Sequence, residues 1–274
     1  LDITINFDLA LLDVALMLTT SGGDIAQVSG SGINVPDIFL DGAFALSSST
    51  SGELSVSGSA CPSFSCSADI SGFFAGVGGT HIGAAYAVKG TTAGDIKGVA
   101  SLAMGAPQPS ASVLPDAQLY TMASTGSASP LSGGYPDGTP NSMALEADFA
   151  GNGELISAQS LYPLTQTVLG NQSATATDVG TSKTLSWGRF TNGNVTADGN
   201  AIALTPSDSV HYIIGQETPA DMMLAIKAGS NAATYTNTAH TTPTGVAGAA
   251  AGEAPEDDAD ADEHPTGKLV AQHA

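Results

Sequence analysis

The sequence predicts an all-β fold: an antiparallel barrel of about eight strands with some extra strands. Charged residues make up only 12% of the chain, about half of their usual share of roughly 25%. Ser, Thr, Asn, Gly and Ala must therefore cover the surface, and this mixture favours strands and turns over surface helices. Turn signals such as Asn192-Gly193-Asn194 and Asp198-Gly199-Asn200 separate many short strand-like segments. Regular turn spacing of this kind is typical of β-sandwiches and barrels.

The chain opens with two segments that read as strands. Apolar and polar residues alternate over residues 1–8, with the period of two that a half-buried strand requires. The same alternation recurs from Val14 to Leu18, so a hairpin is expected here. Helix is the competing interpretation for residues 9–18, but the preceding β pattern favours strand.

Further strands are expected on both sides of a Pro-, Ser- and Gly-rich connection at 104–142, which itself holds a candidate strand around 119–123. In residues 1–103 the candidates are 37–47, 52–58, 66–75, 81–89 and 95–103. In residues 143–244 the candidates are 143–149, 153–159, 183–190, 200–205, 209–216, 222–227 and 232–238. The Gly-rich stretch 76–79 is expected to be a hairpin loop, because a phosphate-binding loop needs a helix after it.

The end of the chain changes character. Residues 245–266 are Ala/Gly-rich and then densely acidic, and such a run is usually a flexible, solvated loop. Residues 267–274 resemble the start of another strand. The acidic run offers oxygen ligands for Ca²⁺, although it lacks the glycine and the spaced glutamate of an EF-hand loop. The weak Ca²⁺ candidates are Asp257, Asp258, Asp260, Asp262 and Glu263.

The charge balance excludes whole classes of partner. The chain has 6 basic and 26 acidic residues and a net charge of −20. Nucleic-acid binding needs Lys and Arg to displace phosphate counterions, and Arg189 is the only arginine. Binding to an anionic membrane surface is disfavoured for the same reason. The longest apolar run, residues 9–18, contains Asp13 and is too short to span a bilayer, so no transmembrane segment is predicted.

Cys61 and Cys66 are the only cysteines, in the string Cys-Pro-Ser-Phe-Ser-Cys. This spacing allows a tight local disulfide, whereas zinc would need two further ligands and no histidine is near in sequence. Two reduced, half-buried thiols are the alternative. A disulfide implies an oxidising compartment, so we expect an extracellular or cell-surface protein. The chain starts at Leu1 without an initiator Met or signal peptide, as a mature form or an excerpt does.

No catalytic constellation stands out, and the chain is predicted not to be an enzyme. A Gly-x-Ser-x-Gly turn between a strand and a helix is missing, and no carboxylate pair is recognisable. His81 and His211 are expected on strands near Tyr86 and Tyr212. Haem or metal ligation by them is conceivable, but ordinary hydrogen-bonding side chains are the favoured interpretation, so no cofactor is predicted.

Two groups of residues resemble the C-terminal β-barrel of transferrin-binding-protein-B-like surface proteins, which also ends bacterial proteins that carry a FecR domain. The first group resembles that family's Gly-Phe-Phe-Gly segment and Gly-x-x-Tyr strand: Gly72, Phe73, Phe74, Gly76, Gly83 and Tyr86. The second group resembles the first half of the barrel in the FecR-linked branch: Trp187, Gly188, Arg189, His211, Tyr212 and Gly215. Trp187 and Arg189 face the same side of a strand, where a structural role at a barrel rim is favoured over a ligand contact.

The two halves stand in reversed order relative to that family. Residues 1–103 resemble the second half of its barrel and residues 143–244 the first half. The chain is then a circular permutant, one period of a tandem array, or a subunit that exchanges strands with its neighbours.

The resemblance and the composition lead to two functional expectations. The first is a non-catalytic extracellular structural or adhesive module that self-associates, as a filament subunit assembled by strand exchange. The alternative is a surface receptor for a host or environmental protein, haem or metal, as the resemblance implies. Binding hot spots are rich in Trp, Tyr and Arg, and the scarcity of these residues favours the first.

Overall fold

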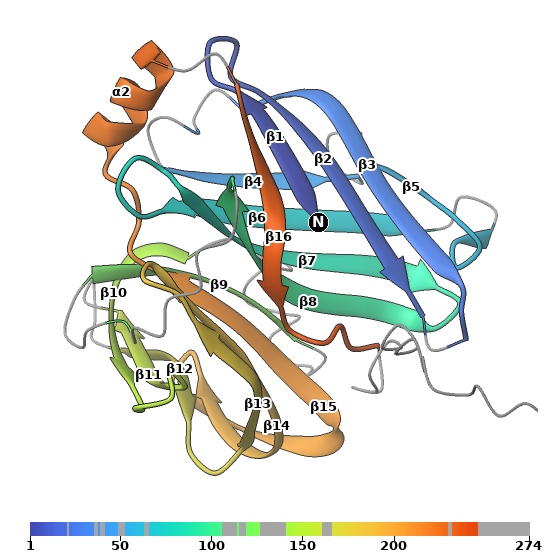
Figure 1. Ribbon diagram of the computed structural model, residues 1–274. Coiled ribbons are helices and arrows are strands. Elements are labelled where there is room, and N and C mark those ends of the chain that lie inside the picture. The colour runs from blue at the N-terminus through green and yellow to red at the C-terminus, as the bar shows by residue number, and fades with distance from the viewer. Residues whose placement is uncertain are drawn as a thin grey trace, which may run out of the picture.

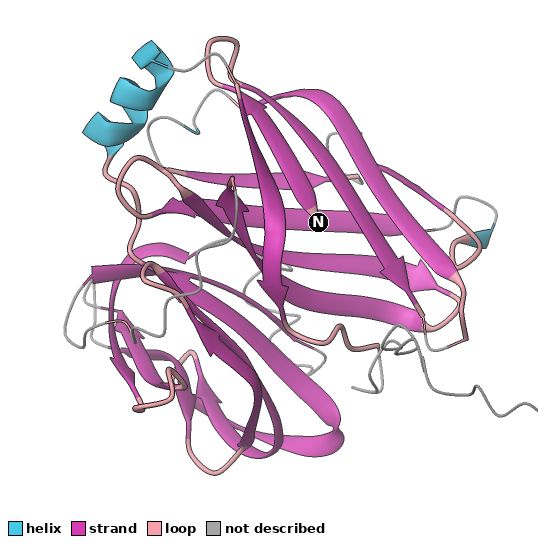
Figure 2. Ribbon diagram, viewed as in Figure 1, coloured by secondary structure: helices cyan, strands magenta, loops and turns pink. Residues whose placement is uncertain are grey.

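The computed structural model describes most of the chain as strands, drawn in magenta in Figure 2. The described residues are 1–20, 22–35, 38, 42–48, 53–62, 66–105, 114, 119–126, 141–160, 166–229 and 232–245. Residues 246–274 lie outside them, so the acidic run with its Ca²⁺ candidates and the predicted strand at 267–274 are not described.

Nine antiparallel strands form the larger sheet, called sheet A. Their order in space is β4 (Ala43–Ser47), β6 (Ser67–Ala75), β7 (His81–Thr91), β8 (Gly94–Met104), β16 (Ala233–His240), β1 (Asp2–Asn6), β2 (Leu11–Thr19), β3 (Ile25–Asn34) and β5 (Ser55–Ser57). The sheet curls over on itself, so that the front strands β16, β1, β2 and β3 cross over the middle strands β6, β7 and β8 (Figure 1). A first apolar core fills the space inside this curl.

Seven antiparallel strands form sheet B. Their order is β12 (Gln166–Asn171), β11 (Leu155–Ser160), β10 (Asn141–Phe149), β9 (Leu119–Gly126), β15 (Asn200–Gly215), β14 (Leu185–Ala197) and β13 (Thr175–Thr181). The far end of β14 also pairs with β12 through Val195, Thr196 and Ala197. Six strands therefore close into a small barrel around a second core, and β13 remains outside as an edge.

The two sheets pack against each other through a third, smaller core. The middle strands of sheet A have one face in the first core and the other against β9, β14 and β15 of sheet B, which lies below them in Figure 1. The burial pattern of β7 accordingly runs almost without interruption, whereas that of β2 alternates strictly. The middle strands therefore separate the first core from the third core and contribute side chains to both.

The all-β, antiparallel, barrel-like class is confirmed. The opening hairpin is β1 paired with β2, and the loop 76–79 joins β6 to β7 as a hairpin. Gly76, Gly78 and Gly79 in this loop all have positive φ, a conformation that glycine adopts at no steric cost. The strands are divided over two sheets, and β16 from the second half of the chain enters sheet A between β8 and β1.

One predicted strand is wrong, because residues 222–227 lie in helix α2 (Ala220–Gly229). Ala, Met, Leu and Lys are good helix formers, and Pro219 precedes the first turn, where its missing N–H costs nothing. The helix buries only Met223 and packs over the turn between β6 and β7. Because this helix is largely exposed, its apolar residues do not recur with a helical period. The sequence pattern of residues 222–227 therefore resembles a strand.

Two turn and boundary predictions also need correction. Asn192-Gly193-Asn194 does not separate strands but is a bulge inside β14, where Asn192 and Gly193 have positive φ. The predicted strands 200–205 and 209–216 are parts of one long strand, β15, which ends at Gly215. Strands β3, β12 and β13 were not predicted, since their Ser, Thr, Gly and Asn residues resemble loop composition.

Candidate functional site

The junction between the sheets has an apolar centre. Phe73 of β6, Val99 of β8, Ala123 of β9 and Ile213 of β15 are completely buried there, with Leu185 of β14 beside them. Small side chains such as Ala75 and Ala85 fill the rest of the layer, so the two backbones can approach closely. Non-directional apolar packing of this kind stabilises the junction but carries no chemistry.

One end of the same junction is polar and is organised around His211 of β15, which is completely buried. Its Nδ1 lies 2.8 Å from the hydroxyl of Thr241, and its Nε2 lies 2.7 Å from that of Thr244 and 3.2 Å from that of Ser209. Buried polar groups have to find hydrogen-bond partners. The histidine therefore fastens the segment 241–244, which follows β16, to sheet B.

The same segment is fastened to sheet A by main-chain hydrogen bonds. The N–H of Lys97 donates to the carbonyl of Thr244, and the N–H of Thr244 donates back, both at 2.9 Å. The ammonium of Lys97 also crosses the junction and donates to the carbonyl of Gly126 at 2.8 Å. Segment 241–244 thus lies between the sheets as a hydrogen-bonded strap.

Arg189 of β14, cross-strand neighbour of His211, completes the polar end. Its Nε lies 3.1 Å from the carboxylate of Asp178 on β13 and donates to the hydroxyl of Thr177, also at 3.1 Å. The same carboxylate accepts from the N–H of Thr242 at 3.0 Å. These contacts favour a structural role for Arg189: together with Asp178 it links β14, β13 and the strap 241–244.

The pKa of His211 is lowered to about 3, first because burial removes water from its charged form and then because Arg189 and Lys97 repel a third positive charge. The imidazole is therefore neutral, donating from one nitrogen and accepting at the other. Ser209 and Thr244 beside it resemble a nucleophile next to a base, but all three side chains are completely buried. A substrate could not reach them, so this cluster is a structural fastening.

The glycines and aromatics of the two motif groups form cross-strand pairs. The ring of one strand lies over a glycine of its neighbour, and a Cβ on that glycine would overlap the ring. The pairs are Phe44–Gly72, Phe73–Gly83, Tyr86–Gly98, Trp187–Gly180 and Tyr212–Gly188. A ring that covers a glycine restores the packing that the missing side chain gives up.

The remaining motif residues have other packing roles. Phe74 faces the first core, where its ring centroid lies 6.3 Å from that of Phe7 and 5.8 Å from that of Tyr235. Gly76 begins the turn after β6. Gly215, at the end of β15, allows close contact with Leu185 and Thr184. The motifs therefore specify strand packing in both sheets.

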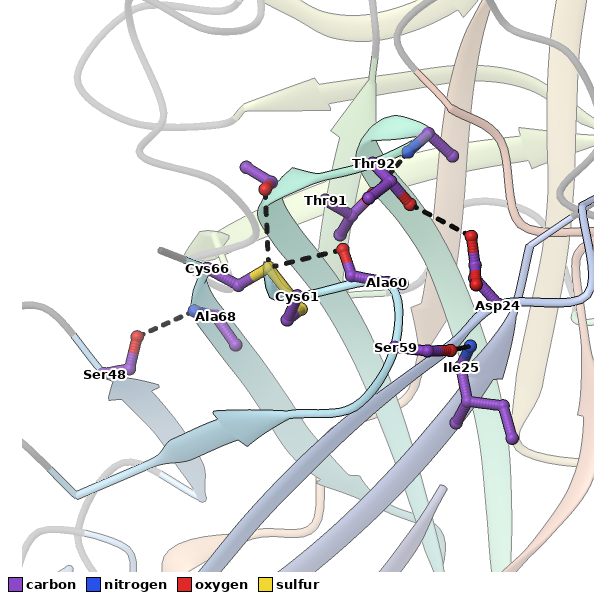
Figure 3. Close-up of a disulfide and its surroundings, with 12 residues drawn as sticks. Asp24, Ile25, Ser48, Ser59, Ala60, Cys61, Cys66, Ala68, Thr91 and Thr92 are labelled. Carbon is purple, nitrogen blue, oxygen red and sulfur yellow. Dashed lines mark hydrogen bonds between the residues drawn. A yellow bond between two sulfur atoms is a disulfide. The ribbon is translucent and has the colours of Figure 1, made fainter. Parts of the chain in front are cut away.

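Cys61 and Cys66 form the predicted disulfide, with Cα atoms 5.4 Å apart. Figure 3 shows it in the connection between β5 and β6, beside the hairpin that joins β7 to β8. The carbonyl of Ala60 accepts from the N–H of Thr92 at 2.8 Å, and the N–H of Ala60 donates to the carbonyl of Ile25 at 2.9 Å. The disulfide loop thus connects the front strands to the middle strands at one end of the curl.

The histidine and tyrosine candidates for haem or metal lie apart from each other. His81 is half-buried and hydrogen-bonded to the hydroxyl of Thr80, and burial lowers its pKa. Tyr86 faces the first core, whereas the hydroxyl of Tyr212 accepts from the N–H of Leu155 in the second core. Within the described ranges, no three His, Cys, Asp or Glu side chains gather as a metal site would require.

Three strands form the edges of the two sheets: β4 and β5 in sheet A and β13 in sheet B. β5 has only three residues. β13 is distorted by a register shift between Thr177 and Gly180 and by the positive φ of Asp178. Short, bulged or charged edges resist pairing with other chains. β4 has none of these protections, since it pairs regularly with β6 and contains neither a charge nor a proline.

Among the residues that the structure covers, no helix has the length and apolarity needed to cross a membrane. No family model, curated protein or solved structure matches this chain. The resemblance to transferrin-binding-protein-B-like barrels stays a prediction from the motifs.

Proposed function

We propose that this protein is a non-catalytic structural module, extracellular or on a cell surface, that associates with copies of itself through the edge strand β4. The outer edge of β4, with which no described strand pairs, carries this proposal. The disulfide agrees with an oxidising compartment, and the continuous buried wall of middle strands suits a rigid building block.

The hydrogen bonds of β4 define which main-chain groups face its outer edge. The N–H of Phe74 donates to the carbonyl of Gly42 and the N–H of Ser48 to that of Ala68, at 2.7 and 2.9 Å. In an antiparallel ladder, the residues between such pairs direct their N–H and C=O groups to the other side. Ala45, in the middle of β4, therefore points its main-chain groups away from β6, where no described strand pairs with it.

Association through this edge does not require exchanged strands. β1 already pairs with β16 on one side and β2 on the other, within its own chain. Pairing of β4 with β4 of a second copy would be two-fold symmetric and would close a dimer, whereas pairing with a different edge would propagate a filament. Main-chain pairing of an added strand supplies affinity in many β assemblies.

The test is to compare Ala45→Pro with Ala45→Val by sedimentation velocity and negative-stain electron microscopy. Proline removes an outward N–H and leaves the β4–β6 hydrogen bonds in place, and edge strands tolerate it. Valine keeps the N–H and favours strand. We expect the native protein and Ala45→Val to associate and Ala45→Pro to be monomeric.

Salt gives a second readout. Because each chain carries a net charge of −20, copies repel one another, and screening by added salt should strengthen association. Monomeric native protein at every salt and protein concentration would contradict the proposal. Assemblies that persist unchanged in Ala45→Pro would show that another surface is used.

A further inference from the structure

A cleft opens at the mouth of the curled sheet A, between its front and middle strands. Its volume is about 190 Å³, and its wall includes Leu16 and Leu18 of β2, Tyr86 of β7, Ala100 of β8, and Asn237 and His240 of β16. Mouths of curled and closed sheets are common places for small ligands. The cleft is separate from β4 and from the polar end of the junction.

The floor of the cleft is apolar and belongs to the first core. Leu16, Leu18 and Ala100 are 3%, 6% and 2% exposed and otherwise pack within that core. A cavity of ~150 Å³ lined by such side chains takes up benzene, whereas drug-sized ligands need roughly 300 Å³ or more. The cleft therefore has room for one aromatic ring with a small substituent, and a porphyrin is far too large for it.

Tyr86 adds a polar group, its phenol hydroxyl, to this apolar wall. Tyr86 is 2% exposed, and its hydroxyl is not among the fully buried polar atoms that lack a hydrogen-bond partner in the described residues. Burial raises the pKa of this phenol, so it remains neutral and can donate or accept. A ligand hydroxyl in the cleft can therefore exchange a hydrogen bond with it.

The rim adds a second polar contact. The side-chain amide of Asn237 lies 3.1 Å from Nδ1 of His240. When the amide nitrogen donates to Nδ1, the other ring nitrogen, Nε2, is the one that carries a proton. The net charge of −20 repels anions, and placing a charge of either sign on the apolar floor is costly, so an uncharged ligand is favoured.

From these observations we propose that the cleft binds a small neutral aromatic molecule of the phenol class, with its ring on Leu16, Leu18 and Ala100 and its hydroxyl on Tyr86. This site goes beyond the structural function proposed above and does not depend on it. It would let the module take up a small aromatic compound from its surroundings.

The test is to titrate the purified protein with three probes, by ligand-observed NMR and calorimetry. p-Cresol carries the ring and the hydroxyl, toluene lacks the hydroxyl, and p-hydroxybenzoate adds a carboxylate that is ionised at neutral pH. We expect saturable binding of p-cresol, weaker binding of toluene and the weakest binding of p-hydroxybenzoate.

Two variants make the test specific. Tyr86→Phe should weaken p-cresol binding about fivefold, the effect of losing one net hydrogen bond, and leave toluene binding unchanged. Thr19→Trp, at an exposed position in the wall of the cleft, should block both probes. Gln27→Trp, exposed on the outer face of β3, is the matched control and should bind as the native protein does.

The proposal is overturned if p-cresol does not bind saturably, or if Thr19→Trp binds it as well as Gln27→Trp does. Equal loss of p-cresol and toluene binding in Tyr86→Phe would also refute the hydroxyl contact. Thermal denaturation of each variant confirms that it is folded before the titrations are compared.

Discussion

The front strands and the middle strands of sheet A belong to one continuous sheet, yet they follow different burial rules. β2 alternates between buried and exposed residues along its whole length, whereas β7 is buried at seven successive positions from Ile82 to Val88. The front strands have water on their outer face, and sheet B covers the corresponding face of the middle strands. The comparison shows that buried and exposed residues alternate where one face of a sheet is in water. The alternation disappears where a second sheet covers that face.

The middle strands combine small and apolar residues, so that both of their faces can be buried. β7 contains Gly83, Ala84, Ala85 and Ala87 beside Ile82, Tyr86 and Val88. Small residues allow close packing of the layers, and the large rings lie over glycines of neighbouring strands. A wall of this type tolerates little change, because its side chains have neighbours on both faces.

The largest expected effect comes from truncating a ring in the middle strands. Phe73→Ala removes a completely buried side chain at the centre of the junction and should lower the free energy of unfolding by about 3–5 kcal/mol. Met17→Ala, on the wet face of β2 where the side chain is 69% exposed, should change it by about 0.5 kcal/mol or less. Urea denaturation of both variants measures the contrast. Equal losses would refute the distinction between the two regions.

A smaller effect is expected at a glycine beneath an aromatic ring. Gly98→Ala would place a methyl group against the hydroxyl of Tyr86 and should destabilise the protein by about 2 kcal/mol, as overpacking does. Gly151→Ala, where no atom lies within reach of the new methyl group, is the control and should be nearly neutral. Similar thermal denaturation of both variants would show that the glycine–aromatic pairs do not restrict packing.

The smallest expected effect is a pH dependence at the polar end of the junction. Burial and the charges of Arg189 and Lys97 lower the pKa of His211 from 6.5 to about 3, so below pH 6.5 the unfolded chain binds a proton that the folded chain does not. The stability that the neutral histidine provides is present above pH 6.5 and is lost progressively as the pH falls toward 3. Between pH 7 and 5.5 the loss should be about 1 kcal/mol.

His211→Gln is the variant that isolates this contribution. Glutamine does not titrate, so the difference in unfolding free energy between pH 7 and 5.5 should shrink, even if the variant is less stable at both pH values. Denaturation with urea at the two pH values measures it. An unchanged difference would assign the pH dependence to other groups.

Much of the fold could be read from local patterns. The opening alternation predicts β1 and β2, and the loop 76–79 predicts the hairpin of β6 and β7. The spacing of Cys61 and Cys66 predicts the disulfide. Each of these features depends on residues close in sequence, whose period, turn chemistry or spacing has few alternatives.

The surroundings of the site residues do not follow from local sequence patterns. Trp187, Arg189 and His211 were singled out from motifs, but their surroundings come from distant segments: Asp178 on β13 and the strap 241–244. The strap gave no signal, because a Thr- and Pro-rich stretch resembles any loop. The cleft brings together β2, β7, β8 and β16, which no local pattern connects.

The sequence by itself determined that this chain is an acidic all-β protein with a hairpin start, and it indicated the local disulfide that the structure contains. Composition and short-range periodicity are enough for that, because they follow from the geometry of single strands and turns. Only the tertiary structure decided that the strands divide into two sheets, that β16 crosses into sheet A and that β6, β7 and β8 are buried on both faces. Those features depend on which apolar surfaces meet, and that is set by long-range packing rather than by neighbours in the chain.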